Sequence, residues 1–187
     1  MEYTVIRSSR KTVSIEYRDG RVILRAPRNV PETELRRIVL ERRDWIEKQA
    51  EKYAGKQQEL AHITPLTADE LKRLKQLAAA AIPPRVSYYA KLLGIRYGTV
   101  TVRAQRTRWG SCSREGNLSF NCLLMLAPGE ALDSVIVHEL CHRLEMNHSP
   151  RFYRLVRGAF PDYDIWSGWL KEHSAGLMKR LPDGKPE

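Results

Sequence analysis

The stretch Val135–Ser149, VIVHELCHRLEMNHS, constrains this chain more than any other. It contains three of the five histidines of the protein. On an α-helix, His138 and His142 lie one turn apart on the same face, and Glu139 sits beside them about 100° round the axis. This is the HExxH arrangement, in which two imidazoles bind zinc and the glutamate activates a water molecule. The pattern therefore predicts two metal ligands, His138 and His142, and one catalytic base, Glu139.

A third metal ligand is expected at His148, six residues after His142. A ligand at this offset comes from beyond the end of the helix, so the chain has to reverse its direction there. Asn147 tolerates the left-handed conformation that such a turn requires. Ser149 and Pro150 have the chemistry of an N-cap and the first residue of a new helix. Three histidines leave a fourth position for water, as catalytic zinc sites do, so the expected cofactor is Zn2+.

The residues around these side chains are apolar on almost every side of the predicted helix, which indicates a buried helix. Two histidines and a glutamate in such a helix need partners, because unsatisfied buried polar groups are costly. A metal ion supplies them. The alternative is two core histidines hydrogen-bonded to the backbone, with Glu139 in a salt bridge. Val135, Ile136 and Val137 also favour a strand, on which the ligand spacing fails.

The formal net charge of +10 is unusual, whereas the apolar and charged fractions of 42% and 29% are ordinary for a soluble protein. Residues 61–126 carry 10 basic and 3 acidic side chains, but residues 127–187, around the metal motif, carry 8 and 9. The basic middle segment predicts either an acidic partner, such as nucleic acid or a nucleotide, or a solvated basic face.

Chain length and cysteine content limit the number of domains and the class of protein to expect. The 187 residues fit one domain, or one domain with an appended subdomain. We expect a β-hairpin and helix over residues 1–60, a metallohydrolase core over 61–181 and a tail over 182–187. Three cysteines without a CxxC pair argue against a disulfide framework. Since the sequence has no apolar leader and no long apolar run, we expect a cytoplasmic protein without a membrane partner, and no oligomeric state is indicated.

The N-terminal third predicts a small sheet covered by a helix. Residues 3–26 alternate apolar and polar side chains in two runs around Asp19-Gly20, which is the strongest short hairpin signal. Apolar residues then recur at helical spacing from Pro31 to Tyr53. Residues 54–66 are polar without periodicity and are predicted to form a connector.

A second helix and a second sheet are expected further along. Thr67 and Glu70 form a capping box that begins the helix. Pro83-Pro84 should break or kink this helix, and Gly94 should end its second part. From Tyr97 to Cys122 the period changes to two, which predicts two or three antiparallel strands.

The segment RTRWGSCS, residues 106–113, lies within this predicted sheet. Gly110 inside a strand indicates close approach of another backbone, and Trp109 beside it is a candidate lid over a site. A bulge with a core tryptophan explains the same residues equally well. The basic excess concentrates on this sheet, at Arg103, Arg106, Arg108 and Arg114.

Several segments together resemble a known family. They are SSRKTVSI and GRVILRAP near the N-terminus, Trp45-Ile46, RWGSCS at 108–113, Leu118 with Phe120-Asn121, HELCH at 138–142, NHS at 147–149 and PDY at 161–163. In this combination the chain resembles, over nearly its whole length, the YgjP-type predicted metal-dependent hydrolases, relatives of the WLM and SprT-like zinc metalloproteases. The metzincin pattern HExxHxxGxxH fits less well, because Glu145 stands where that pattern has glycine.

The resemblance implies an α+β, zincin-like fold, in which a small antiparallel or mixed sheet lies over the active-site helix. In such a fold the edge strand of the sheet pairs with an extended substrate. The corresponding edge in this sequence lies near Trp109 to Cys112. Trp109, Gly110 and Ser111 are therefore candidate binding residues for a protein or peptide substrate.

The first functional hypothesis is a zinc-dependent peptidase with Glu139 as the base that takes a proton from the attacking water. A side chain that assists the oxyanion is expected, and the candidates are Arg151, Tyr153 and Tyr163. Carboxylates that would orient a ligand histidine are Glu145, Asp162 and Asp164.

Two other hypotheses keep the metal. One is a nucleotide phosphohydrolase, a nucleoside triphosphate pyrophosphatase, whose phosphates the middle arginines would hold; the sequence lacks a phosphate-binding GxxxxGK[ST] loop and an acidic magnesium cluster. The other is a nucleic-acid-binding module with a structural metal, for which Cys141 is a conceivable fourth ligand. A packing role suits Cys141 better, since it lies about 60° from His138 on the side away from Glu139.

Overall fold

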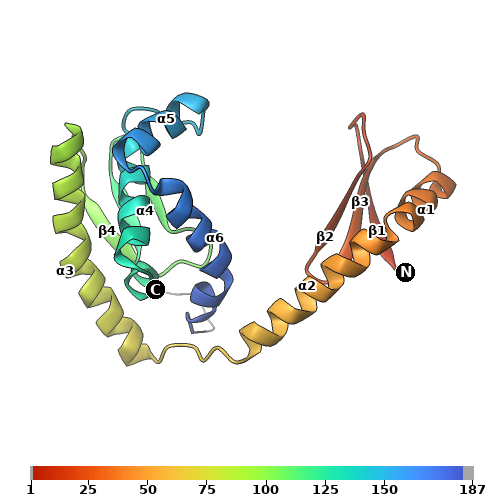
Figure 1. Cartoon of the computed structure of the whole chain (residues 1–187), viewed down its shortest axis with the longest axis horizontal. Coiled ribbons are helices and arrows are strands. Elements are labelled where there is room, and N and C mark those ends of the chain that lie inside the picture. The colour runs from red at the N-terminus through yellow and green to blue at the C-terminus, as the bar shows by residue number, and fades with distance from the viewer. Residues whose placement is uncertain (1, 183–187) are drawn as a thin grey trace. The chain divides into compact units, whose positions relative to one another are not determined.

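The computed structural model describes residues 2–182, so the part of the expected tail at 183–187 lies outside the described residues. The chain divides into two compact units, Met1–His62 and Ile63–Glu187 (Figure 1). The domain limits expected at residues 60 and 181 stay a prediction. Within residues 2–182, no helix combines the length and apolar character needed to cross a membrane.

The first unit contains a three-stranded sheet, β1 (Tyr3–Ser8), β2 (Ser14–Arg18) and β3 (Arg21–Pro27), in the order β1-β3-β2. The predicted hairpin is confirmed: β2 and β3 are antiparallel, and Asp19 and Gly20 both have positive φ, 52° and 77°, as a type I′ turn requires. The sequence did not indicate β1 as a separate strand. It pairs parallel to β3, a contact between segments that no local pattern predicts.

Two helices follow the first sheet, α1 (Glu32–Glu41) and α2 (Arg43–Ala61), so the single helix predicted from Pro31 is wrong. Arg42 interrupts it with φ −102° and ψ 11°. The apolar spacing does not reveal this break, because Leu35 and Ile46 are 11 residues apart, about three helical turns, and pack in one core. The connector prediction is also wrong over 54–61, where good helix formers extend α2 without an apolar face.

The second unit begins with α3 (Ala68–Leu93), whose capping box between Thr67 and Glu70 is confirmed. Gly94 ends the helix in the left-handed conformation, with φ 65°. The predicted interruption at Pro83-Pro84 is absent, and α3 is one helix of 26 residues. Fully buried side chains on both sides of the prolines, Ile82 and Val86 among them, hold the helix against the core and outweigh the lost hydrogen bonds.

A second small sheet consists of β4 (Val100–Arg103), β5 (Gly110–Cys112) and β6 (Leu118–Asn121), in the order β4-β6-β5. β4 is parallel to β6 and β5 is antiparallel to it, so the sheet is mixed, whereas the local alternation predicted antiparallel strands. β5 forms one edge. A 3₁₀ helix, η1 (Cys122–Leu126), follows β6 directly.

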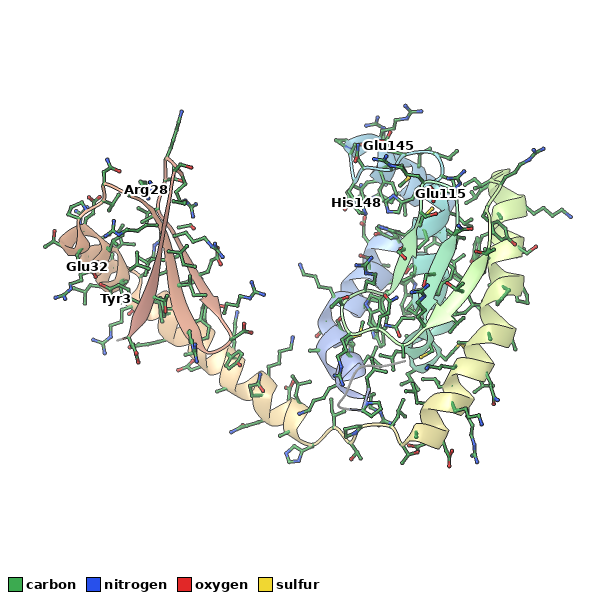
Figure 2. The ribbon with its side chains drawn as sticks, turned by 180° about the vertical axis from the view of Figure 1, so that it is seen from behind. Tyr3, Arg28, Glu32, Glu115, Glu145 and His148 are labelled. Atoms are coloured by element: carbon green, nitrogen blue, oxygen red, sulfur yellow. The ribbon has the colours of Figure 1, made fainter. Side chains whose placement is uncertain are left out.

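Three further helices complete this unit: α4 (Gly129–Cys141), α5 (Pro150–Ala159) and α6 (Tyr163–Lys179). The helix α4 is central, in contact with α3, α5, α6 and β5. The sheet lies behind α4 in Figure 1 and in front of it in the reverse view of Figure 2. The fold is therefore α+β, with a small mixed sheet over a buried helix, as expected. Ile136 and Leu140 of α4 are fully buried against the sheet and α3.

Candidate active site

The helix α4 carries the HExxH motif, so the helical assignment needed for the ligand spacing is correct and the strand alternative is excluded. His138 is half-buried, Glu139 is buried, and His142 is the C-cap residue of the helix. The ring centroids of His138 and His142 are 4.9 Å apart. Both imidazoles therefore stand on one face of α4.

The chain reverses after α4 and brings His148 back to the other two histidines. Ser149 is the N-cap of α5, its side chain accepting a hydrogen bond from the Phe152 amide, and Pro150 begins the helix, as predicted. Nε2 of His148 lies 3.0 Å from Nε2 of His138. The predicted left-handed Asn147 is wrong, because Asp19 is the one non-glycine residue with positive φ among residues 2–182. The loop turns by short backbone hydrogen bonds instead, such as that from Glu145 to Cys141.

The three imidazoles form a nearly equilateral triangle, with ring centroids 4.8 to 5.0 Å apart. Phe152 is fully buried and lies 4.5 to 4.9 Å from all three rings, centroid to centroid. It fixes the rings by packing, because each imidazole contacts one shared aromatic side chain. The Ser149 N-cap and the position of Phe152 therefore set the geometry of the cluster together.

Hydrogen bonds to Nδ1 of His138 and of His142 determine which ring nitrogen of each is available to a metal ion. Nδ1 of His138 lies 2.8 Å from the Tyr163 hydroxyl, and Nδ1 of His142 lies 3.2 Å from the Glu145 carbonyl oxygen. A carbonyl only accepts, so Nδ1 of His142 donates and its Nε2 keeps a free lone pair. If Nδ1 of His138 donates to Tyr163, its Nε2 keeps a free lone pair in the same way. Candidate ligand atoms of His138, His142 and His148 all lie within 4.8 Å of one another.

This donor set fits a transition metal ion. Burial, with the charges of His142 and His148 next in importance, lowers the pKa of His138 to about 3, and burial lowers the pKa of His142. Both are then neutral near pH 7, the form in which imidazole binds metals. Two nitrogens bound to one tetrahedral zinc lie roughly 3.3 Å apart for bonds of about 2.0–2.1 Å, close to the 3.0 Å between His138 and His148.

The carboxyl of Glu139 lies beside the cluster in an enclosed position, 6% exposed. Burial raises its pKa to about 8, and the nearby Arg108 guanidinium opposes this rise. A base that works near neutral pH needs a pKa close to that pH. A cation held by the three histidines would further favour the ionised carboxylate. The salt bridge considered in the alternative explanation of Glu139 is absent among the described residues.

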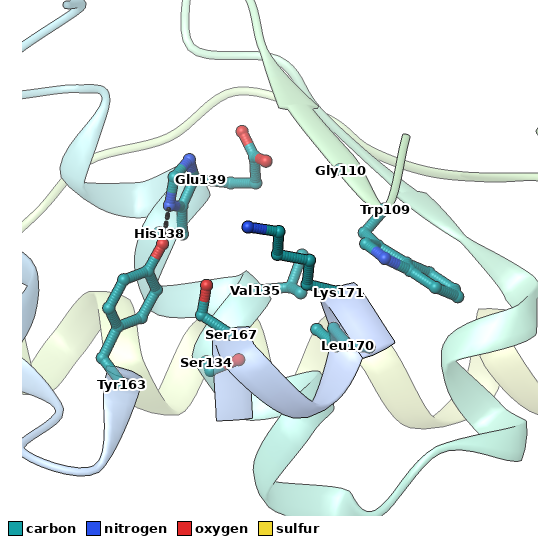
Figure 3. A pocket seen from close by; sticks show the side chains of 10 residues that line it. All are labelled: Trp109, Gly110, Ser134, Val135, His138, Glu139, Tyr163, Ser167, Leu170 and Lys171. Carbon is teal, nitrogen blue, oxygen red and sulfur yellow. Dashed lines mark hydrogen bonds between the residues drawn. The ribbon is translucent and has the colours of Figure 1, made fainter. Parts of the chain in front are cut away.

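Gly110 is the residue against which Glu139 packs. A Cβ atom added at Gly110 would lie 2.7 Å from both Cγ and Oε1 of Glu139, closer than real Cβ contacts. The close approach expected at Gly110 therefore exists, but the neighbour is a side chain and not another backbone. Trp109 and Gly110 line one pocket with His138 and Glu139 (Figure 3).

Ser111, the third candidate for substrate contact, lies elsewhere. It lines a polar groove of about 550 Å³ together with Arg103 and Arg108. Its neighbour Gly110 faces Glu139, since successive strand residues face opposite sides of a sheet. Arg106 is engaged differently, because its guanidinium donates to the carbonyl oxygens of Leu181 and Pro182. The arginines of the basic middle segment therefore lie in two different environments: Arg103 and Arg108 line a groove, and Arg106 contacts the backbone near the end of the described chain.

The site and most of the chain match one protein family. A model of the YgjP-like metallopeptidase domain matches residues 11–72 and 69–173, which include all three histidines and Glu139. The chain belongs to the YgjP-like family. The resemblance seen in the sequence is confirmed, and the chain is a metallopeptidase-like hydrolase that uses a metal cofactor.

Two solved structures are similar to part of this YgjP-like chain. They are the metallopeptidase zymogens jannalysin of Methanocaldococcus jannaschii, 21% identical, and abylysin of Pyrococcus abyssi, 19% identical. Each match covers 49% of this chain and 94% or 93% of the other, with a TM-score of 0.43. No curated protein matches the YgjP-like chain significantly.

The side chains that contact the histidine cluster of the YgjP-like domain differ from the carboxylates expected from the sequence. Glu145 contacts His142 through its backbone carbonyl and not its carboxylate. Asp164 forms an ion pair with Arg157, 2.8 Å between Oδ2 and Nε. No contact of Asp162 with a ligand histidine exists among the described residues. Tyr163, a candidate oxyanion partner on the sequence, contacts His138 instead.

The contact of Phe152 with the three histidines was not predictable, because its spacing with Leu155 and Val156 is typical of an ordinary amphipathic helix. The hydroxyl of Tyr153 and the guanidinium of Arg151 remain candidates for the oxyanion partner, whereas the hydroxyl of Tyr163 is engaged with His138. Arg151 lies 3.9 Å from Glu145, Nε to Oε2.

Cys141 is buried in a cluster with Val137 and Phe152 and is not part of the histidine group, as the packing interpretation predicted.

Proposed function

We propose that this chain is a zinc-dependent peptidase in which His138, His142 and His148 hold the ion and Glu139 is the catalytic base. The observation that carries the proposal is the position of one buried carboxyl beside a triangle of three imidazoles, two of which have Nδ1 engaged in a hydrogen bond. Three histidines suit a catalytic zinc site, which keeps a position open for water or substrate. A bound zinc ion supplies Lewis acidity and makes water a nucleophile near neutral pH.

The chain's own residues then perform the remaining steps. Glu139 takes a proton from the attacking water and returns it to the leaving amine, as a buried carboxyl with a pKa near neutrality is able to do. Tyr163 and the Glu145 carbonyl fix the orientation of His138 and His142. Gly110 lets Glu139 approach the sheet.

The edge strand β5 is the proposed docking site for an extended peptide. Within residues 2–182, β5 pairs with β6 on one side and has no strand on the other. A peptide strand added to this edge would gain main-chain hydrogen bonds. It would also run past Trp109 and Gly110, beside Glu139. This placement agrees with a protein or peptide substrate for the YgjP-like domain.

Hydrolysis of a mixed peptide library by zinc-loaded protein, followed by mass spectrometry, tests the proposal. We expect cleavage by the wild type and a loss of about 10²- to 10⁴-fold in Glu139→Gln, because this variant keeps the shape but not the base. Zinc content should be unchanged in Glu139→Gln. Glu172→Gln on the exposed side of α6 is the matched control and should cleave normally. Equal cleavage by Glu139→Gln would remove Glu139 from the mechanism.

The phosphohydrolase alternative has weaker support. Arg103, a side chain suited to phosphates, lines the groove with Ser111, whereas Glu139 lines the pocket with Trp109. Of the two arginines in the groove, only Arg108 lies near Glu139. Release of phosphate or pyrophosphate from nucleoside triphosphates, abolished in Glu139→Gln, would favour it. The nucleic-acid-binding alternative needs a structural metal, usually with four protein ligands, and the described histidine cluster offers three.

A further inference from the structure

The pocket beside Glu139 extends away from the histidine cluster, between α4 and α6 (Figure 3). Its volume is about 270 Å³. Pockets for whole small-molecule ligands are roughly 300–1,000 Å³, so this one has room for a part of a substrate such as one side chain. Because His138 and Glu139 form one end of the pocket, a group bound there belongs to a residue next to the bond being cleaved.

The walls of the pocket combine apolar surface with a single cation. Trp109, Val135 and Leu170 supply the apolar surface. Lys171 is the one lysine or arginine among the described residues that line it. Figure 3 shows the amine of Lys171 extending from α6 into the pocket, toward the side on which Glu139 lies.

Lys171 forms no ion pair or hydrogen bond with another residue in the range 2–182. Two other cations in the second unit do have acidic partners: Arg85 pairs with Asp133 and Arg157 pairs with Asp164. A lysine that reaches over apolar walls, and whose amine has no partner within the pocket, is suited to pair with an anion that enters there.

We propose that this pocket binds a carboxylate-bearing part of the peptide substrate, with the ammonium of Lys171 paired to the carboxylate. The proposal rests on the proposed peptidase function. Trp109 and Leu170 would pack against the methylene groups that carry the carboxylate. Either an acidic side chain or the C-terminal carboxylate of the substrate has this chemistry. Lys171 is then a residue that determines specificity and takes no part in the proton transfers of Glu139.

The test compares cleavage sites in a peptide library for wild type, Lys171→Met, Lys171→Glu and the control Lys179→Met, an exposed lysine of α6 outside the pocket. In the wild type we expect a carboxylate at a fixed position next to the cleaved bond. Peptides that carry Glu or Gln at that position, each with a free or amidated C-terminus, then distinguish a side chain from a terminus.

The expected result is a loss of about tenfold in kcat/KM for the carboxylate substrate in Lys171→Met, with the uncharged substrate unaffected. Lys171→Glu should reverse the preference in favour of a lysine-containing peptide, and Lys179→Met should match the wild type. Equal losses on charged and uncharged substrates would overturn the proposal, since Lys171 would then act on the reaction itself. No preference for a carboxylate in the wild type would overturn it too.

A binding measurement separates this proposal from the peptidase proposal. Fluorescence polarisation with labelled Glu- and Gln-containing peptides on zinc-loaded Glu139→Gln, with and without Lys171→Met, needs no turnover. Tighter binding of the Glu peptide, lost in Lys171→Met, supports the pocket assignment even where the wild type cleaves nothing. Equal affinities for both peptides contradict it even where cleavage by the wild type depends on Glu139.

Discussion

The hydroxyl of Tyr163 lies 2.8 Å from Nδ1 of His138, across 25 residues of sequence. This contact connects the start of α6 to the metal motif on α4. It leaves Nε2 of His138 facing His148, 3.0 Å away. The bond therefore explains how a ring on a buried helix is held in the orientation that a metal ligand needs.

Replacement of Tyr163 by phenylalanine should weaken zinc binding by about 10- to 100-fold, because His138 loses the partner that fixes its ring and tautomer. Competition with a zinc-binding dye measures the affinity. The circular dichroism spectrum should not change, since phenylalanine fills nearly the same space. An unchanged zinc affinity would show that Tyr163 does not orient His138, and would restore it as an oxyanion candidate.

Gly110→Ala tests the contact between β5 and the carboxyl of Glu139, the proposed catalytic base. The added Cβ would lie 2.7 Å from Cγ of Glu139, so the carboxyl has to move. A displacement of about 1 Å near reacting groups costs up to about 10²-fold in rate. We expect a loss of this order in kcat with zinc content preserved. Gly168→Ala on α6 is the control, because an added Cβ there meets no atom within 4 Å. Similar rates for both variants would contradict the assignment.

Asn121 ties the loop before β5 to the sheet. Its side-chain amide donates to the carbonyls of Gln105 and Arg108, at 2.6 and 3.0 Å, and its oxygen accepts from the Leu123 amide. Asn121→Ala leaves these buried groups unpaired and should lower the free energy of unfolding by about 3 kcal/mol, measured by urea denaturation. Asn121→Asp keeps the acceptor but loses both donors and should also be destabilising. A change below about 0.5 kcal/mol in either variant would contradict this role.

The capping box of α3 predicts a pH-dependent stability. Hydrogen bonds from Thr67 lower the pKa of Glu70 in the folded protein. A carboxylate with a lowered folded-state pKa stabilises above its unfolded pKa and loses this contribution as pH falls through the folded value. The wild type should therefore melt higher than Glu70→Gln at pH 6, and the difference should shrink toward pH 3. A difference in melting temperature that does not vary with pH would contradict this account.

Short sequence motifs predicted those parts of the fold that depend on residues close together in the chain. The Asp19-Gly20 turn, the Thr67 capping box and the Ser149 N-cap each depend on residues a few positions apart, and all three are confirmed. The same holds for His138, His142 and His148, which fall within eleven residues and meet as predicted. The arrangement of a small sheet over the HExxH helix was expected from the family resemblance and not from periodicity.

Contacts distant in sequence were not predictable in this way. No local pattern indicates that β1 pairs with β3, or that Tyr163 meets His138. Buried packing around Pro83-Pro84 outweighed a helix-breaking signal that is valid for an isolated helix. The sequence does not single out Lys171, because one lysine on an amphipathic helix indicates a binding site only when the opposite wall of the pocket is known.

Zinc content per chain, measured by plasma mass spectrometry on protein purified without metal-affinity resin, tests the central claim most directly. Wild type and His148→Ala should be compared after dialysis against zinc, with His173→Ala as the control histidine on α6, outside the cluster. The account predicts about one zinc per chain in the wild type and in His173→Ala, and a clear loss in His148→Ala. Wild-type protein without bound zinc, or His148→Ala with a full complement, would contradict a three-histidine metal centre.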